Sequence, residues 1–209
     1  VTITRKGAEA KKFDATKIFA DYMANKAGDE AKEKALAAEN KRKQQEAEEQ
    51  RKAEYKAKYG SVLAAKVKYL NDVKATATET TSGLKYKIIP NATGKKPAEG
   101  TNVFIHYAGY LEDGSLFDSS YENVNKEFGK FDENRAKQNG YQPFPFQYGK
   151  KEGLIPGFIE ALNMMNFGDK IIAFIPSKLG YGERGAGNVI PPNSNIIFEI
   201  EMLEAAPAK

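Results

Sequence analysis

The sequence predicts an α+β protein in which an antiparallel sheet covers one short helix, preceded by an N-terminal helical region. Aromatic and β-branched residues concentrate after residue 83, where stretches of alternating polarity recur. The part before residue 83 is instead rich in Ala, Lys and Glu, which favour exposed helices. One amphipathic helical pattern lies among the later strands and completes the α+β assignment. We therefore expect a charged helical extension and linker over residues 1–82 and a compact domain over residues 83–209.

The composition excludes several classes of reactive site. The chain contains no cysteine, which rules out disulfides, thiolate zinc sites and cysteine nucleophiles. Its single histidine, His106, rules out metal sites with several histidine ligands and leaves one candidate base for a Ser-His-Asp arrangement. No stretch approaches the roughly 18 apolar residues of a membrane-spanning helix. We therefore expect no metal, no cofactor and no membrane span.

The first thirty residues predict a strand end followed by a short helix. Residues 1–5 alternate in polarity as a strand does, and they resemble the end of a structure that lies upstream. Asp14 is placed to cap a helix, and Gly28 with Asp29 predicts a break and a second N-cap. The apolar face of this short helix comprises Ile18, Phe19, Tyr22 and Met23.

Residues 30–58 have strong helix propensity but no apolar stripe. Glu–Lys pairs at i,i+4 spacing begin at residues 30, 39, 48 and 54, and they favour a solvated single helix or a weak coiled coil. The basic triplet 41–43 lies among glutamates without interleaved aromatic residues, so we expect no nucleic-acid partner. Apolar residues return over 55–70 around Gly60, so a last helical segment there could pack on another element. Residues 76–83 have the composition of a polar linker at the domain boundary.

The compact domain is predicted from its succession of strands and turns. An Asp-Gly turn at residues 113–114 has the chemistry of a β-hairpin. Pro156 opens the short helix, and Gly168 lies just past its end. Strands are expected at residues 84–89, 102–111, 116–119, 144–148, 169–175 and 195–203.

Physical arguments disfavour the apparent catalytic signatures. Residues 180–185 fit the pattern G-x-G-x-x-G, but the prolines at 191–192 preclude the helix that a dinucleotide site needs there. A lone histidine on a strand, as His106 is, is more often a hydrogen-bonded structural residue than a catalyst. Asp113 lies in a turn and Asp118 is isolated among aromatic and serine neighbours, which disfavours catalysis by paired carboxylates.

What remains is a set of large apolar residues beside turns and loops. The simplest interpretation is that they form the core. Tyr181 and Ile190, however, lie in glycine- and proline-rich loops, where exposed backbone disfavours deep burial. A concave apolar site with a few polar groups, such as Asp118 and tyrosine hydroxyls, would suit a small apolar ligand or a proline ring. The set comprises Tyr107, Phe117, Phe144, Leu154, Ile155, Phe158, Tyr181, Ile190 and Phe198.

Four stretches of the sequence resemble the FKBP-type peptidyl-prolyl cis-trans isomerases. They are GLKYKII (83–89), HYAGYLEDGSLFDSS (106–120), LIPGFIEALNMMNFGDK (154–170) and IPSKLGYGERGAGNVIPPNSNIIFEIEML (175–203), in unbroken order. The resemblance implies a curved antiparallel sheet wrapped around the short helix, and an isomerase that acts on X-Pro bonds and assists protein folding. It further implies proline-containing polypeptide substrates, macrolide ligands and no cofactor.

The resemblance also implies a role for each residue of a proline site. Phe158 would form the floor of this site. The Ile155 N–H and the Tyr181 hydroxyl would contact carbonyls of the bound peptide. Asp118 would lie near the Tyr107 hydroxyl. Tyr107, Asp118, Tyr181 and Phe198 match the catalytic positions, whereas Phe117, Phe144, Leu154, Ile155, Phe158 and Ile190 match the substrate-binding positions. A binding module or holdase chaperone with little turnover is the alternative function.

The sequence departs from the family pattern around this site. Phe158 stands where many members have tryptophan, and Ala186 where many have histidine. Residues 121–142 replace a much shorter connection, and we weigh a substrate-facing flap, a disordered loop and a neutral insertion for them. The basic residue that many members place near Asp118 cannot be assigned within this segment.

Residues 1–22 show a second, shorter resemblance. VTITRKGAEAKKFDATKIFADY is similar to the closing strand and exit helix of a cyclophilin-like domain in bacterial cyclophilin–FKBP fusion proteins. This similarity implies an upstream isomerase domain. The other interpretations of the N-terminal helices are a homodimerisation arm, as in bacterial FKBP proteins with helical extensions, and a plain spacer. The cytoplasm is slightly favoured over the periplasm as the location.

Overall fold

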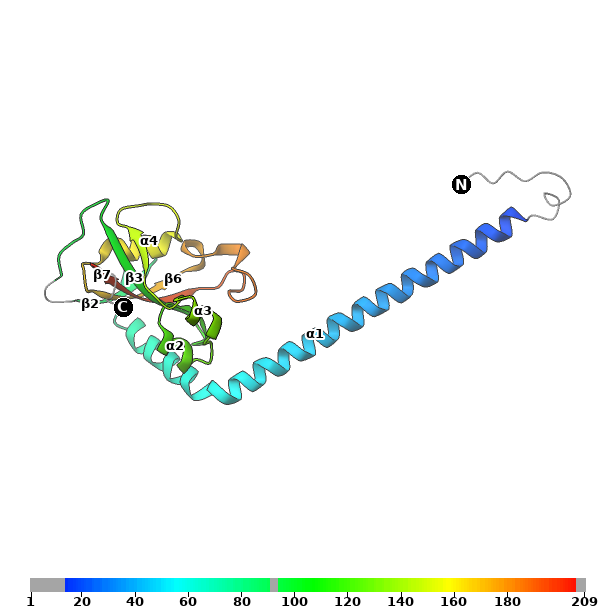
Figure 1. Cartoon of the computed structure of the whole chain (residues 1–209), viewed down its shortest axis with the longest axis horizontal. Helices are drawn as coiled ribbons and strands as arrows, with labels where there is room; N and C mark the ends of the chain where they lie inside the picture. The colour runs from blue at the N-terminus through cyan, green and yellow to red at the C-terminus, as the bar shows by residue number, and fades with distance from the viewer. Residues whose placement is uncertain (1–13, 91–93, 206–209) are drawn as a thin grey trace. The chain divides into compact units, whose positions relative to one another are not determined.

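The computed structural model describes residues 14–90 and 94–205 of the 209-residue chain. The chain divides into two compact units, Val1–Ala57 and Lys58–Lys209 (Figure 1). Within the described residues, no helix has both the length and the apolar character to cross a lipid bilayer. The strand expected over residues 1–5 lies outside the described residues.

One helix, α1 (Ala15–Lys74), replaces the three helical segments that the sequence predicts. Its start is as predicted, because the Asp14 carboxylate accepts a hydrogen bond of 3.0 Å from the Lys17 backbone N–H. The predicted break at Gly28 and Asp29 is wrong, since the helix continues through both residues. One glycine costs a helix about 1 kcal/mol relative to alanine, and the surrounding strong helix formers outweigh this cost.

Within the described residues, the first unit consists of the N-terminal part of α1, and apart from half-buried Tyr55 its described side chains are exposed. The predicted i,i+4 ion pairs include Lys43 with Glu39 at 2.8 Å and Lys52 with Glu48 at 2.7 Å. Such exposed pairs add a few tenths of a kcal/mol each, so this stretch is a solvated helix. Its apolar residues Ile18, Phe19, Tyr22 and Met23 are also exposed.

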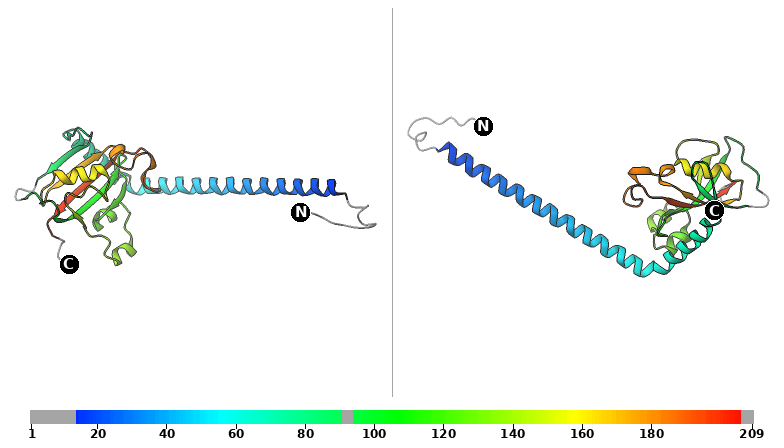
Figure 2. Two further views of the ribbon diagram at one scale, coloured as in Figure 1. Left: turned by 90° about the horizontal axis from the view of Figure 1, so that it is seen from above. Right: turned by 180° about the vertical axis from the view of Figure 1, so that it is seen from behind.

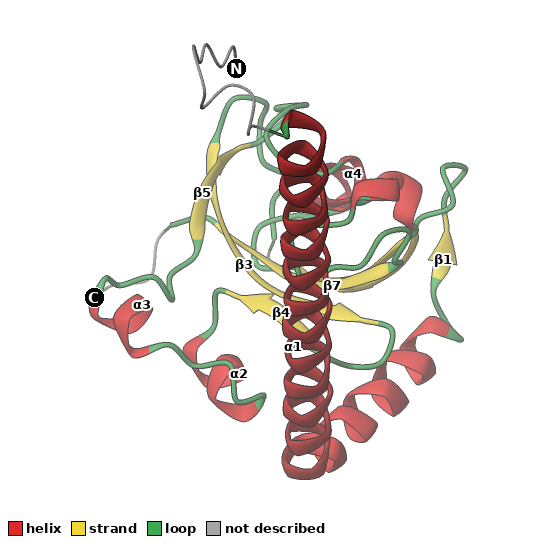
Figure 3. Cartoon of the chain, turned by 90° about the vertical axis from the view of Figure 1, so that its right-hand side faces the viewer, coloured by secondary structure: helices red, strands yellow, loops and turns green. Residues whose placement is uncertain are grey.

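The second unit is built on one antiparallel sheet, which confirms the predicted α+β class. Within the described residues its seven strands follow the order β1-β2-β6-β7-β3-β4, and β5 pairs with the free part of the β3 edge. Figure 3 shows how strongly these strands curve. The strands are β1 (Thr78–Glu79), β2 (Lys85–Ile89), β3 (Asn102–Leu111), β4 (Leu116–Ser119), β5 (Phe144–Gln147), β6 (Lys170–Ile175) and β7 (Ile196–Leu203).

The concave face of the sheet wraps around α4 (Pro156–Met164), as Figure 2 shows. Pro156 occupies the first turn, where its missing N–H costs nothing, and the helix buries its apolar face on the sheet. Phe158 and Leu162 pack there against inward-facing residues of β3, β6 and β7. This face forms the main core of the unit.

The convex face of the sheet is covered by the C-terminal part of α1, residues 58–74. Leu70 is 2% exposed, and Val62 and Leu63 pack beside it against a cluster from the outer side of β3, β6 and β7. Lys66 adds an ion pair of 3.2 Å with Glu199 on β7. The compact unit therefore starts at Lys58, upstream of the boundary expected between residues 82 and 83.

The segment expected to be a polar linker is also part of the sheet. Residues 78–79 form β1, which pairs with β2. The Ser82 hydroxyl then donates to the Glu160 carboxylate of α4 at 2.8 and 2.9 Å. Local composition alone does not reveal these partners, because both are distant in sequence.

The segment 121–142 is folded rather than disordered. It contains the short helices α2 (Glu122–Glu127) and α3 (Glu133–Lys137) and joins β4 to β5. The glycine-rich loop after β6 forms two 3₁₀ turns, Ser177–Leu179 and Gly182–Arg184, and then a bridge between Ala186 and Ile190. This loop opens no α-helix, as the prolines predict.

We expect Leu70→Ala to destabilise the compact unit by about 2–5 kcal/mol, because it empties a filled site behind the sheet. Leu36→Ala is the matched control, since Leu36 lies on the same helix and is 59% exposed. Its effect is expected to stay within about 0.5 kcal/mol. Urea unfolding followed by tyrosine fluorescence measures both. Equal effects of the two substitutions would contradict the packing of residues 58–74 on the sheet.

Candidate active site

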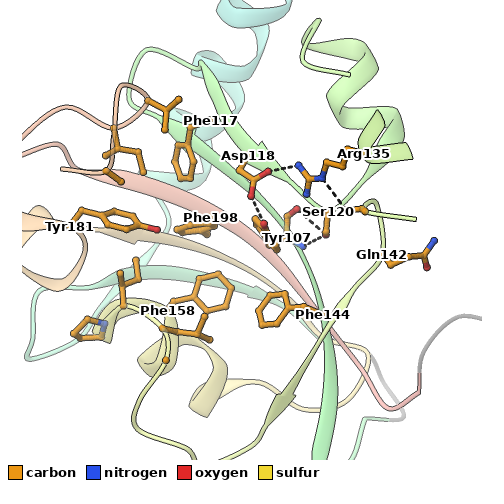
Figure 4. A pocket seen from close by; sticks show the side chains of 18 residues that line it. Tyr107, Phe117, Asp118, Ser120, Arg135, Gln142, Phe144, Phe158, Tyr181 and Phe198 are labelled. Carbon is orange, nitrogen blue, oxygen red and sulfur yellow. Dashed lines mark hydrogen bonds and ion pairs between the residues drawn. The ribbon is translucent and has the colours of Figure 1, made fainter. Parts of the chain in front are cut away.

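A pocket of about 870 Å³ opens between the concave face of the sheet and α4. The close view in Figure 4 shows aromatic rings around it and a group of polar side chains at one end. Every residue that the sequence predicts for the site lines this pocket: Tyr107, Phe117, Asp118, Phe144, Leu154, Ile155, Phe158, Tyr181, Ile190 and Phe198. The lining also includes Ser120, Arg135, Gly140, Gln142, Gly153, Pro156, Ala186 and Val189, which the sequence does not predict.

The bottom of the pocket consists of aromatic rings that meet edge to face. The ring centroids of Phe158 and Phe198 lie 4.9 Å apart with an interplanar angle of 87°, and Tyr107 stands 6.0 Å from Phe198. Phe158 is 4% exposed and lies at the bottom of the pocket. Phe117 adds a further edge contact with Phe198, at 5.4 Å. This geometry is favourable between rings and leaves an apolar surface facing the cavity.

Gly109 on β3 makes room for two of these rings. A Cβ atom at this position would overlap the ring of Phe117 and lie 2.8 Å from the ring of Phe198. The pairing of β3 with β4 also shifts register between Gly109 and Tyr110, and this bulge aims the side chains of β4. Glycine is needed here for close approach of side chains to the backbone.

The Asp118 carboxylate lies at the polar end of the pocket and is held by three donors. The Tyr107 hydroxyl donates to Asp118 Oδ2. Arg135 Nη1 donates to Asp118 Oδ1 at 2.7 Å. The Ser119 backbone N–H donates to the same oxygen at 2.9 Å. The carboxylate is therefore fixed in orientation at the edge of an apolar surface.

Burial raises the pKa of Tyr107 well above its ordinary value of 10.0, and the hydrogen bond to Asp118 adds to this effect. The Tyr107 hydroxyl therefore keeps its proton through the neutral range and stays a donor. Burial alone would lower the pKa of Arg135, but the hydrogen bond and charge of Asp118 raise it above its ordinary value. The Arg135 guanidinium consequently stays protonated.

Arg135 is the basic partner of Asp118 that sequence reasoning missed. It lies on α3, a helix of five residues whose N-cap Asp132 accepts hydrogen bonds from the Asn134 and Arg135 backbone N–H groups. Arg135 Nε donates to the Gly140 carbonyl at 3.0 Å, and its guanidinium lies 4.7 Å from the Tyr141 ring. The capping pattern at residues 132–135 could have predicted a short helix here. It could not have predicted that the Arg135 side chain points toward Asp118.

His106 lies outside the pocket and has a structural role, as predicted. Its Nδ1 lies 2.8 Å from the Ser120 hydroxyl, and its ring stacks on Tyr121 at 4.3 Å. Tyr121 in turn donates to Glu201 on β7 at 2.5 Å. Burial lowers the pKa of His106 below its ordinary value of 6.5.

Two donor groups line the rest of the opening. Tyr181 is 36% exposed beside the glycine-rich loop, and burial together with the Asp118 charge raises its pKa. Ile155 is the N-cap of α4 in extended conformation, and no residue within 14–90 or 94–205 accepts a hydrogen bond from its N–H. Among the described residues, no group of three or more His, Asp or Glu side chains could hold a metal. The Ile155 N–H and the Tyr181 hydroxyl can donate to an extended chain, and the aromatic rings of the pocket can surround an apolar ring.

Residues 93–203 match the family model described as "FKBP-type peptidyl-prolyl cis-trans isomerase". The chain is 39% identical over 149 residues to the "FKBP-type 22 kDa peptidyl-prolyl cis-trans isomerase" of Escherichia coli, covering 70% of this chain and 63% of that protein. It is 36% identical over 121 residues to "FK506-binding protein 1" of Dictyostelium discoideum, covering 58% of this chain and 96% of that protein.

A solved structure, FkpA from Escherichia coli, aligns over 94% of this chain and 84% of its own length. The sequence identity is 26% and the TM-score is 0.49. The chain spans less than two thirds of the length of several curated relatives. For the 22 kDa Escherichia coli protein the covered share is 63%.

We expect His106 to make the compact unit lose stability in mild acid. Its folded pKa lies below the value of 6.5 that the unfolded chain has. As pH falls below 6.5, the unfolded chain binds the proton more readily than the folded chain, so the free energy of unfolding decreases. Above pH 6.5 the histidine is neutral in both states and this loss is absent. Urea unfolding from neutral pH down to about pH 5 should show a smaller decline for His106→Gln than for the wild type. Parallel declines would contradict the lowered pKa of this half-buried histidine.

Proposed function

The chain belongs to the FKBP-type peptidyl-prolyl cis-trans isomerase family, and on that premise we propose that it accelerates rotation about X-Pro bonds in protein chains. This activity would assist folding, because uncatalysed X-Pro isomerisation is slow enough to limit it. The substrates are flexible or unfolded polypeptides that present a proline. The observation that carries the proposal is the aromatic pocket with a fixed carboxylate at one end.

The proposed mechanism needs no covalent step. Rotation about an amide bond faces a barrier of roughly 18–20 kcal/mol, because resonance is lost at the perpendicular geometry. The carbonyl of that transition state is less polar than the ground-state carbonyl. A dry aromatic pocket therefore stabilises the transition state relative to water. Phe158, Phe198 and Tyr107 provide this environment.

The polar groups around the pocket fix the peptide. We assign the Ile155 N–H and the Tyr181 hydroxyl to carbonyls of the bound chain, since both line the opening. We place the rotating carbonyl beside Asp118. The Tyr107 hydroxyl and Arg135 donate hydrogen bonds to the Asp118 carboxylate, so this polar group has partners at the edge of an apolar site. Of the other lining residues, Phe117, Phe144, Leu154 and Ile190 would enclose the proline ring.

Two departures from the family pattern bear on this proposal. Phe158 keeps an aromatic floor in place of tryptophan. Residues 121–142 supply Arg135, Gly140 and Gln142 to the pocket wall, which supports a substrate-facing role for this segment. A binding module or holdase with little turnover would use the same pocket, so a rate measurement separates the two functions.

We expect the protein to accelerate cis-trans isomerisation of an X-Pro peptide in an isomer-specific assay. Tyr181→Phe should lower kcat/KM by about 2- to 10-fold, the loss expected for one hydrogen bond. Asp118→Val should lower it further, because it also leaves the Tyr107 hydroxyl and Arg135 without their acceptor. Circular dichroism checks that both variants remain folded.

A folded wild type without acceleration above background would contradict the isomerase and favour the binding module. A bell-shaped pH profile between about pH 6 and 8 would contradict the uncharged mechanism, because it requires an essential titrating group. We expect a flat profile, since Tyr107 keeps its proton there and His106 lies outside the pocket.

For the N-terminal region we propose a spacer that ends in an assembly element. Apolar residues occur at two ends of α1, but the stretch within 58–74 is used by the sheet of its own chain. The exposed residues Ile18, Phe19, Tyr22 and Met23 are therefore the surface available to pair two copies. The similarity of residues 1–22 to the end of a cyclophilin-like domain supports a different proposal, an upstream isomerase domain, which the full reading frame tests.

We expect light scattering to find a homodimer for the whole chain and a monomer for a fragment that starts at Lys58. Phe19→Ser should also give a monomer, because it removes apolar surface that is 64% exposed in one copy. Leu36→Ser is the control on the solvated part of the same helix. A monomeric whole chain would support the plain spacer. A dimer that persists from Lys58 would place the interface on the compact unit.

A further inference from the structure

The strand that carries Asp118 is packed on both faces. Phe117 and Asp118 of β4 face the pocket, whereas Leu116 is 2% exposed in the cluster beneath residues 58–74 of α1. The turn that leads into β4 lies directly on α1. A Cβ atom at Gly114, in this turn, would be 2.7 Å from the Leu63 carbonyl. The end of α1 therefore supports β4 from behind.

The same part of α1 also supports α2. Phe128 at the end of α2 is 1% exposed, and its ring centroid lies 5.5 Å from that of Tyr110 on β3. Lys66 of α1 lies 6.0 Å from the Phe128 ring. Gly129 follows with φ of +63°, and a Cβ atom there would overlap the ring of Tyr59. Tyr59 thus sits against the C-terminal end of α2, and Figure 1 shows α2 beside the last turns of α1.

From α2 the chain leads to Arg135 within a few residues. The helix α2 has six residues and α3 has five, so neither is stable without tertiary contacts. The Asn125 side chain ties the start of α2 to the Ser119 carbonyl at 2.9 Å. The Lys130 N–H donates to the Asn125 carbonyl at 2.7 Å, and Asp132 then caps α3. The position of Arg135 on Asp118 depends on this connected path.

We propose that residues 58–74 of α1 position the Asp118–Arg135 pair of the pocket, with Tyr59 as the positioning residue that seats α2. This inference rests on the proposed isomerase function for its kinetic consequence. The physical basis is that a pair at the edge of a pocket works only in one geometry, and a displacement of about 1 Å can cost a large factor in rate. Arg135 lies on α3, a helix of five residues that follows α2. Because such short helices depend on their neighbours, we infer that the packing of α2 on α1 determines where Arg135 lies.

The kinetic test compares Tyr59→Ala with Tyr59→Phe in the whole chain. We expect Tyr59→Ala to lower kcat/KM for an X-Pro peptide roughly 10-fold, and Tyr59→Phe to restore most of it by replacing the ring. Leu36→Ala is the control and should leave the rate unchanged, since that side chain is exposed far along the same helix. Tyr59→Leu replaces the alanine variant if the latter does not fold. A rate within about twofold of wild type for the variant without the ring would overturn the proposal.

A double-mutant cycle separates positioning from general destabilisation. If Tyr59 acts through Arg135, Tyr59→Ala should cost less than about twofold once Arg135→Gln is present. Fully additive effects of the two substitutions would overturn the proposed path. Unfolding in urea, measured for the same proteins, keeps stability apart from rate.

A third readout does not need catalysis. The Arg135 Nε–H donates to the Gly140 carbonyl at 3.0 Å, so its NMR signal should be protected from solvent exchange in the wild type. We expect this protection to fall in Tyr59→Ala and to remain in Leu36→Ala. Unchanged protection in the Tyr59 variant would overturn the proposal. An inactive wild type with the expected change in protection would instead sink the isomerase function and leave the positioning role supported.

Discussion

The sheet of the compact unit has apolar side chains on both faces, and each face needs a cover. The concave face closes on α4, with Phe158 and Leu162 at its centre. The convex face closes on residues 58–74 of α1, where Leu70 is buried. Removing either cover would expose a contiguous apolar surface to water, at roughly 25 cal/mol per Å². Residues 58–74 of the long helix are thus part of the compact unit.

The pocket combines an apolar floor with a carboxylate, Asp118, that is held by hydrogen-bond donors. The rings of Phe158, Phe198 and Tyr107 meet edge to face and form this floor. Asp118 is kept at the edge because Arg135 and the Tyr107 hydroxyl share its charge. The arrangement is consistent with a catalyst that changes the environment of an amide bond rather than its covalent chemistry.

The insertion after β4 connects these two themes. It adds Arg135 to the pocket on one side and places Phe128 under α1 on the other. Short helices such as α2 and α3 depend on neighbours for their stability. One segment therefore links the cover of the convex face to the polar end of the pocket on the concave face. Residues 58–74 of α1 and the pocket therefore belong to the same compact unit.

The sequence by itself determined six of the seven strands of the described sheet, the helix from Pro156 and, with the family resemblance, the residues that gather at the pocket. These features follow from short-range alternation, turn chemistry and motifs, which act over a few residues. Only the tertiary structure decided that α1 runs through Gly28, that residues 58–74 belong to the compact unit, and that Arg135 is the partner of Asp118. The free energy that one glycine costs is smaller than the helix stability that the surrounding residues supply. Helix propensity also carries no information about the surface on which an amphipathic helix packs. The Asp118–Arg135 pair forms across the α2–α3 insertion, where no local pattern specifies the direction of a side chain.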